Sequence, residues 1–252
     1  MNLGLSGKIA AVTGGARGIG RETCLKLAEE GADVAVIDRL IDGAKETADM
    51  VCEYGRKGVA VQADVSDFQS VREAFETIVA ELGPVDVLVS GAALTDNVAT
   101  IEKMSLEAWN RELGVNLSGT FHCVKMVGPA MAERGWGRII IISSRAGLDG
   151  GFGQVAYAST KAGICGLAKT AALEYARNGV TANIVFPSLA NTAPAQRMPE
   201  DIKQRILRRI PTRRLQDPEE VASVVAFLAS DQARSINGAE IMVTGGIELF
   251  TF

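Results

Sequence analysis

Residues 8–31 read KIAAVTGGARGIGRETCLKLAEEG, and this stretch decides the fold. Lys8–Thr13 is short and apolar, as a buried strand should be, and the pattern of Arg21–Glu30 predicts an amphipathic helix. The turn between them, Thr13–Gly20, is rich in glycine, which has no Cβ atom and lets the backbone bend sharply and approach a ligand closely. A helix that begins at such a turn points free N–H groups at an anion. The stretch therefore predicts a strand, turn and helix that bind the pyrophosphate of a dinucleotide.

The same alternation of strands and helices continues to the end of the chain. Several of the strand-like runs carry apolar residues on both faces, as parallel strands covered by helices on both faces require. We therefore predict an α/β fold, a Rossmann-type doubly wound parallel sheet with helices on both faces, in a single dinucleotide-binding and catalytic domain over residues 1–252. The strands are expected at Lys8–Thr13, Asp33–Asp38, Val59–Ala63, Val85–Ser90, Arg138–Ser143, Thr181–Phe186 and Glu240–Val243, and further helices at Ser66–Leu82, Ser105–Arg134, Gln154–Arg177 and Pro218–Ala229.

Composition excludes several classes of protein. The formal net charge of −4 gives no general attraction for nucleic acid or for an anionic membrane. The four cysteines form no CxxC pair, which is typical of reduced thiols in a cytoplasmic protein. We expect no signal peptide, because the start of the sequence lacks a basic segment followed by a long apolar stretch, and no apolar run approaches the roughly 18 residues that span a bilayer. His122 is the only histidine, so we expect it to serve packing or an interface and expect no metal site.

The segment from Pro187 to Pro211 interrupts the alternation. It contains four prolines and a cluster of basic residues. It follows the sixth strand, and open α/β sheets bind ligands at the carboxyl ends of their strands. We therefore expect residues 188–211 to form a substrate lid.

The acid at the end of the second strand bears on the choice of cofactor. Asp38 lies twenty residues after Gly18, where a carboxylate can accept hydrogen bonds from the adenosine ribose and would repel a 2′-phosphate. This favours NAD over NADP, although Arg17 and Arg39 could each reach a 2′-phosphate.

Asp64 and Val65, directly after the third strand, lie where an adenine ring is expected. Together with Ser66, Asp64 can equally begin the next helix by capping it, and the two interpretations are compatible.

Tyr157 and Lys161 are four residues apart in a predicted helix, so their side chains share one face. A free tyrosine has a pKa of about 10, which is high for proton exchange at neutral pH. A nearby ammonium group and the positive ring of an oxidised nicotinamide would favour the phenolate and lower that value. Ser144, at the end of the fifth strand, can hydrogen-bond a substrate oxygen and hold it against the phenol.

Taken together, these residues resemble the short-chain dehydrogenase/reductase family, in its compact single-domain branch of about 250 residues. The resemblance covers essentially the whole chain: the TGxxxGxG turn, Asn116 in a VNLxG segment, Ser144, the YxxxK pair and a closing helix at Pro218–Ala222. It implies hydride transfer between a nicotinamide and a carbinol or carbonyl carbon, and assembly as a homotetramer or homodimer. It also implies that Tyr157 is the acid/base, that Lys161 binds ribose, and that Asn116 holds a water of a proton relay.

The cofactor-binding residues expected on these grounds come from the glycine turn, the ends of the strands, the catalytic helix and the start of the lid. They are Gly14, Arg17, Gly18, Ile19, Gly20, Asp38, Asp64, Val65, Gly91, Tyr157, Lys161, Pro187, Leu189 and Thr192.

Two segments depart from the family pattern. An NNAG sequence is usual after the fourth strand, whereas this chain has SGAA at 90–93, so an Asn that ties the sheet together is missing. The usual Pro-Gly after the sixth strand is replaced by Pro187 and Ser188, which fit that turn only if the φ of the serine is negative.

The substrate is expected to be a small molecule, and its class stays open. Arg145 and Arg197 can recognise an anionic group through the planar guanidinium, and Phe152 can supply an apolar wall, although solvated basic residues and simple core packing explain them as well. One alternative function is an NADPH-dependent 3-oxoacyl-thioester reductase, which would prefer a basic residue at position 38. Another is a non-catalytic dinucleotide-binding protein, which has no need of Ser144, Tyr157 and Lys161 together.

Overall fold

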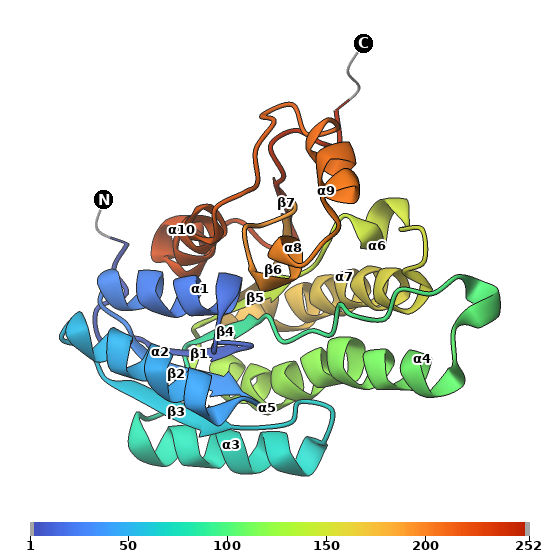
Figure 1. Ribbon diagram of the computed structural model, residues 1–252. Coiled ribbons are helices and arrows are strands. Elements are labelled where there is room, and N and C mark those ends of the chain that lie inside the picture. Colours follow the sequence, from blue (N-terminus) through green and yellow to red (C-terminus); the bar gives the residue numbers. More distant parts are fainter. Residues whose placement is uncertain (1–2, 250–252) are drawn as a thin grey trace.

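Seven parallel strands form one sheet in the order β3-β2-β1-β4-β5-β6-β7 in the computed structural model, which describes residues 3–249. This is the predicted doubly wound arrangement, in which β1 and β4 are neighbours and successive crossovers run outward from them. Because all strands are parallel, their carboxyl ends meet at one edge of the sheet (Figure 1). The strands are β1 (Ile9–Thr13), β2 (Asp33–Asp38), β3 (Gly58–Gln62), β4 (Val87–Ser90), β5 (Gly137–Ile142), β6 (Val180–Pro187) and β7 (Glu240–Val243).

Helices cover both faces of the sheet, as predicted (Figure 1). The four consecutive isoleucines of β5 show why a strand covered on both faces needs adjacent apolar residues: Ile139 and Ile141 point into one core and Ile140 and Ile142 into the other. Helix α2 was not among the predicted helices. One core is closed by α3 (Phe68–Glu81), α5 (Gly119–Arg134) and α7 (Val155–Tyr175), and the other by α1 (Gly18–Glu29), α2 (Ile41–Glu53) and α10 (Pro218–Ala229).

The helix expected over Ser105–Arg134 contains a π-helical turn. Helix α4 (Leu106–Glu112) runs into this turn at Leu113–Ser118, and α5 continues from Gly119. A π-turn inserts one extra residue into a helix and is frequent at functional sites. Here it carries Asn116. Periodicity alone cannot show such a turn, because the helical pattern on either side is preserved.

The segment predicted as a lid contains two short helices, α8 (Ala193–Gln196) and α9 (Glu200–Leu207). Figure 1 shows them beyond the carboxyl ends of β6 and β7. Backbone hydrogen bonds join the two ends of this excursion, from Gln216 to the carbonyl of Leu189 at 3.1 Å and from Asn191 to the carbonyl of Gln216 at 2.8 Å. The remaining short helices are α6 (Ala146–Asp149) and single turns at Ile101–Lys103, Ala176–Asn178 and Asp231–Ala233.

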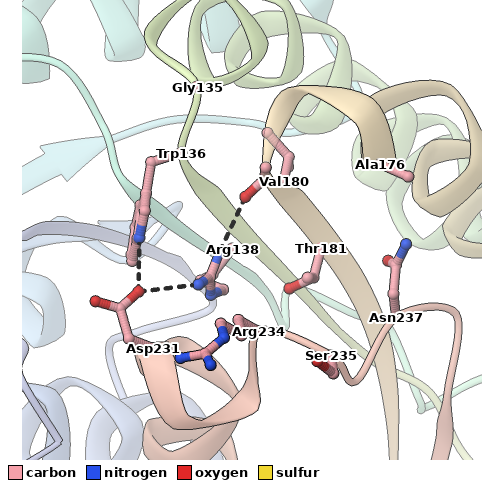
Figure 2. A pocket seen from close by; sticks show the side chains of 11 residues that line it. Gly135, Trp136, Arg138, Ala176, Val180, Thr181, Asp231, Arg234, Ser235 and Asn237 are labelled. Carbon is pink, nitrogen blue, oxygen red and sulfur yellow. Dashed lines mark hydrogen bonds and ion pairs between the residues drawn. The ribbon is translucent and has the colours of Figure 1, made fainter.

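A buried arginine stabilises the opposite edge of the sheet, where β5 and β6 begin. Arg138 is 2% exposed and donates to the carbonyls of Gly137 and Gly179 at 2.8 and 3.2 Å, and to Asp231 at 3.1 Å. Arg138 and Asp231 line a cavity of about 400 Å³, where Figure 2 shows them beside Trp136. The centre of the Trp136 ring lies 4.3 Å from the guanidinium carbon of Arg138.

Candidate active site

The turn after β1 has a shape that requires glycine. Gly14 has a φ of 76°, and a Cβ atom there would lie 3.0 Å from the backbone of Ala92. A Cβ on Gly20 would lie 2.0 Å from the carbonyl oxygen of Gly14, closer than any real contact. The first turn of α1, with the partly buried Ile19, is therefore folded back tightly against the glycine turn.

Helix α1 begins with free backbone donors. Its N-cap, Arg17, is extended and exposed, and no side chain caps the first N–H groups. Gly18, with a φ of 58°, would bring a Cβ within 3.1 Å of the Thr192 side chain, so the start of the lid segment lies against this turn. The free N–H groups and the positive end of the helix dipole suit a phosphate group.

Asp38 lies at the end of β2, beside the glycine turn. One carboxylate oxygen accepts a hydrogen bond from the N–H of Ala16 at 3.1 Å and the other from the N–H of Leu40 at 2.9 Å. These bonds fix the carboxylate at the carboxyl edge of the sheet and leave lone pairs for further donors. Arg17 and Arg39 are exposed, and neither forms an ion pair within residues 3–249.

A threonine hydroxyl holds the segment that departs from the family's NNAG. Thr13, the last residue of β1, accepts hydrogen bonds from the N–H groups of Gly91 and Ala92 at 3.1 and 3.2 Å. Ser90 donates to Thr120 at 3.2 Å, and Thr120 donates to the carbonyl of Asn116 at 2.9 Å. These serine and threonine hydroxyls tie β4 to the helices where the usual Asn is missing.

Sequence reasoning missed the part played by Thr13. A hydroxyl residue at the last position of the strand that precedes a glycine turn was the available signal.

The segment after β6 accepts serine without strain. Arg213 is the one non-glycine residue with positive φ in the described part of the chain, so Ser188 meets the condition set by the sequence. Its N–H donates to the carbonyl of Val243 and to the side chain of Gln216, both at 3.0 Å. Pro187 is buried at the end of β6, and Leu189 follows in the same edge of the sheet.

Ser144, Tyr157 and Lys161 come together at this edge. Ser144 follows β5; its hydroxyl accepts a hydrogen bond from the N–H of Ala146 at 3.2 Å and lies near enough to the phenol of Tyr157 to lower its pKa. Lys161, one turn further along α7, is 3% exposed, and its Nζ atom lies 5.7 Å from the centre of the Tyr157 ring. The ammonium group donates to the carbonyl of Ile142 at 2.8 Å. The tyrosine thus has the serine hydroxyl near its phenol and the lysine beside its ring.

The pKa values in the protein itself differ from the simple expectation. Burial raises the pKa of Tyr157, and the nearby hydroxyl of Ser144 only partly offsets this effect. Burial also lowers the pKa of Lys161 to about 8. Desolvation penalises both charged forms. The lowering of the tyrosine pKa by Lys161 and an oxidised nicotinamide together stays a prediction.

Known proteins are similar to this chain over almost its full length. A family model described as Enoyl-(Acyl carrier protein) reductase matches residues 14–248. The 3-oxoacyl-(acyl-carrier-protein) reductase FabG of Staphylococcus epidermidis is 40% identical over 245 residues, which cover 95% of this chain and 98% of the relative. The chain belongs to the short-chain dehydrogenase/reductase family.

Solved structures of the family superpose closely on this chain. Levodione reductase matches with a TM-score of 0.94 at 27% identity over 98% of this chain and all of the other. NAD⁺-bound xylitol dehydrogenase matches with a TM-score of 0.92 at 28% identity over 96% of this chain and all of the other. Like other members of the short-chain dehydrogenase/reductase family, this chain is an oxidoreductase, and the family binds a nicotinamide dinucleotide.

The residues of this short-chain dehydrogenase/reductase fit such a dinucleotide. The glycine turn leaves no room for a Cβ atom at Gly14 or Gly20, and α1 presents free N–H groups for the pyrophosphate. Asp38 stands where a ribose would be held, and Tyr157 and Lys161 lie at the same edge of the sheet.

The side chain of Asn116 has a structural role, because it hydrogen-bonds the backbone of the loop after β4. It is fully buried, and its amide accepts from the N–H of Leu94 at 2.7 Å and donates to the carbonyl of Leu94 at 3.0 Å. This pair of bonds fixes the loop after β4 beside the catalytic helix. The water relay through Asn116 stays a prediction.

Asp64 and Val65 form the turn that leads into α3. Asp64 accepts hydrogen bonds from the N–H and the hydroxyl of Ser66 at 2.9 and 2.6 Å, which lower its pKa, while Asp67 caps the helix. The carbonyl of Val65 lies 2.9 Å from Nδ1 of His122, so the histidine ties α5 to this turn. Contact with adenine stays a prediction. Within residues 3–249 no cluster of potential metal ligands occurs, and no helix is long and apolar enough to cross a membrane.

The residues expected to contact substrate come from three segments, which follow β5, precede α7 and follow α8. Arg145 forms an ion pair with Asp149 on α6, so its charge is already balanced within the protein. Arg197 is exposed after α8, and Phe152 is 93% exposed, which rules out the core packing that was its alternative explanation. All three substrate contacts stay predictions.

Proposed function

We propose that this protein is an NAD-dependent dehydrogenase or ketoreductase that interconverts a secondary alcohol and its ketone, or an alcohol and its aldehyde. The observation that carries this proposal is that Ser144, Tyr157 and Lys161 lie close together at the sheet edge that also holds the glycine turn, whose backbone leaves no room for Cβ atoms. The bound nicotinamide would accept or supply the hydride at its C4 atom. Every proton step falls to the side chains of this chain.

The three side chains divide the proton chemistry between them. In carbonyl reduction, the phenol of Tyr157 donates its proton to the carbonyl oxygen as the C–H bond forms. In alcohol oxidation, the phenolate accepts the hydroxyl proton. The hydroxyl of Ser144 hydrogen-bonds the same substrate oxygen and holds it at the phenol. The ammonium group of Lys161 favours the phenolate once a second positive charge lies beside it.

NAD is favoured over NADP by the carboxylate of Asp38. Its two oxygens are held by backbone N–H groups at 3.1 and 2.9 Å, so the negative charge is fixed where it repels a 2′-phosphate. NAD⁺-bound xylitol dehydrogenase is a structural relative, which supports the same choice.

Asp38→Asn should reduce the preference for NAD over NADP. The amide keeps the shape and one acceptor but loses the charge, so the ratio of kcat/KM for the two cofactors should fall by roughly 10-fold or more, the value of one charge-assisted hydrogen bond. Steady-state kinetics with each cofactor measure this ratio. Asp33→Asn, at the other end of β2, is the matched control. An unchanged ratio in the Asp38 variant would show that the carboxylate does not distinguish the ribose of NAD from the 2′-phosphorylated ribose of NADP.

The main alternative is an NADPH-dependent 3-oxoacyl-thioester reductase, as the name of the staphylococcal relative suggests. Both enzymes would use the same catalytic residues. A panel of neutral and anionic alcohols, ketones and 3-oxoacyl thioesters, assayed with NAD(H) and NADP(H), separates them. A preference for thioesters with NADPH would replace the proposed activity, and a preference for anionic alcohols would support contacts to Arg145 or Arg197.

We also propose that the subunits assemble as a homotetramer or homodimer. Exposed apolar side chains on neighbouring helices support this: Leu106 on α4 is 80% exposed, Phe121 on α5 is 49% exposed, and Leu173 on α7 is 81% exposed. The double variant Phe121→Lys, Leu173→Lys should sediment as a monomer, because buried like charges oppose association. Leu249→Lys, also exposed, is the control. A wild-type protein that sediments as a monomer at micromolar concentration would overturn the proposal.

A further inference from the structure

A cavity of about 400 Å³ lies at the edge of the sheet opposite the candidate active site (Figure 2). Its lining comes from the turn before β5, the turn before β6 and the segment between α10 and β7. Arg138, in its wall, lies at the start of β5, whereas Ser144 follows the end of that strand, about 20 Å away at the rise of an extended chain. The cavity is therefore separate from the site where hydride transfer is proposed.

The charge of Arg138 is balanced within the protein. Its guanidinium donates to Asp231 at 3.1 Å and to three backbone carbonyls at 2.8 to 3.2 Å. A guanidinium has five N–H groups, so one of them remains for another acceptor. The same oxygen of Asp231 also accepts from the indole of Trp136 at 2.8 Å. These bonds fix Arg138 and Asp231 as rigid parts of the cavity wall.

Arg234 adds a positive charge that the cavity does not balance. It is exposed and lines the cavity, and within residues 3–249 its guanidinium forms neither an ion pair nor a hydrogen bond. The lining thus contains two arginines against one acid, Asp231. A further cation lies close by, because Nζ of Lys8 is 3.7 Å from the centre of the Trp136 ring. The excess of positive charge attracts an anion to this cavity.

A buried hydroxyl in the same wall has no hydrogen-bond partner. Thr181, near the start of β6, is 5% exposed, and its Oγ1 atom is unpaired among the residues that the structure describes. In the view of Figure 2 this oxygen is turned toward Arg138 and Arg234. An unpaired buried hydroxyl is unfavourable, because it has lost water without gaining another partner. An acceptor oxygen of a ligand in the cavity would supply that partner.

The polar groups of the cavity are mainly donors. The hydroxyl of Ser235 and the amide of Asn237 also line it, and the amide nitrogen donates one of its two N–H groups to the carbonyl of Ala172 at 2.9 Å. The amide oxygen of Asn237 and Oδ1 of Asp231 already accept bonds from the protein. A phosphate or carboxylate group matches this set, because it is negative and consists of acceptor oxygens that a guanidinium can bind in pairs.

We propose that this cavity is a second ligand site, which binds a small molecule through a phosphate or carboxylate group. Arg234 and the remaining N–H of Arg138 hold the anionic oxygens, and the hydroxyl of Thr181 donates to one of them. The ligand joins the turns before β5 and β6 to the segment before β7, so its binding stabilises the folded protein. The site is independent of the reaction proposed above.

The fluorescence of Trp136 tests this proposal, because its ring lines the cavity and contacts Arg138. In the variant Trp109→Phe it is the only tryptophan. Titration with inorganic phosphate at constant ionic strength should change this fluorescence and reach saturation, whereas chloride should not. Saturation by phosphate alone assigns a phosphorylated ligand, and saturation by acetate as well assigns carboxylates too. A protein that neither phosphate nor acetate saturates would overturn the proposal.

A dinucleotide distinguishes this cavity from the glycine turn, which also suits a phosphate. The titration is repeated with saturating NAD⁺ and with saturating NADP⁺, which occupy the glycine turn, and the midpoint for phosphate should stay in place. A response that either dinucleotide abolishes would place the anion at the glycine turn and contradict the second site.

Two substitutions in the cavity should weaken phosphate binding. Arg234→Gln should raise the dissociation constant roughly 10-fold, the value of one charge-assisted hydrogen bond, and Thr181→Val should raise it a few-fold. Because the threonine hydroxyl has no partner in the protein, Thr181→Val without phosphate should unfold at the same or a higher temperature than the wild type. Arg209→Gln removes an equally exposed charge from the lid segment and is the matched control. Wild-type affinity in both cavity variants would show that phosphate binds elsewhere.

Discussion

Tyr157→Phe should lose about 10³-fold in kcat while dinucleotide affinity changes only a few-fold. The substitution removes one oxygen atom, and that oxygen is the group that lies near Ser144 and that exchanges the proton with the substrate. General acid/base catalysis by a positioned side chain contributes roughly 10²–10⁴-fold, so this single atom should account for most of the chemical step. The ring and its neighbour Lys161 would remain in place, and binding should persist.

The measurement is single-turnover kinetics together with dinucleotide binding by fluorescence. Tyr54→Phe is the matched control, because this tyrosine is 49% exposed at the end of α2 and far from the sheet edge. Full turnover by the Tyr157 variant would show that another group handles the proton, and the assignment of the active site would be wrong.

Gly20→Ala should destroy dinucleotide binding and destabilise the fold. The added Cβ atom would lie 2.0 Å from the carbonyl oxygen of Gly14. Neither atom can rotate away, because the oxygen belongs to the backbone and the Cβ atom is bonded directly to it. Either the glycine turn opens or the first turn of α1 moves. Overpacking of this kind costs about 1–3 kcal/mol of folding free energy. The same displacement moves the N–H groups that would hold the pyrophosphate, so affinity should fall by roughly 100-fold or more.

Gly166→Ala is the corresponding control. In the subunit no atom lies within 4 Å of a Cβ at this position in the middle of α7, and alanine is the better helix former by about 1 kcal/mol. Unfolding by denaturant and isothermal titration with NAD and NADP measure both effects. A Gly20 variant that binds either dinucleotide with wild-type affinity would contradict the proposed packing of the turn.

The sequence determined the fold and the identity of the chemical groups. Strands that carry apolar residues on both faces, such as β5, are suited to burial between two layers of helices. The glycines of the turn after β1 predict a backbone that passes where a Cβ atom has no room. The spacing of Tyr157 and Lys161 places them on one helix face whatever the surroundings. These properties are local, which is why pattern and spacing are enough to predict them.

The tertiary structure decided how those groups behave. Burial raises the pKa of Tyr157 and lowers that of Lys161, and neither shift follows from the spacing of the two residues. Contacts across the sequence also decided that Thr13 holds the SGAA segment and that Arg145 is paired. A glutamate on a helix is usually a solvated charge, and only the folded protein shows that Glu112 is buried. Desolvation and long-range electrostatics depend on neighbours far apart in the chain, so they could be known only from the folded protein.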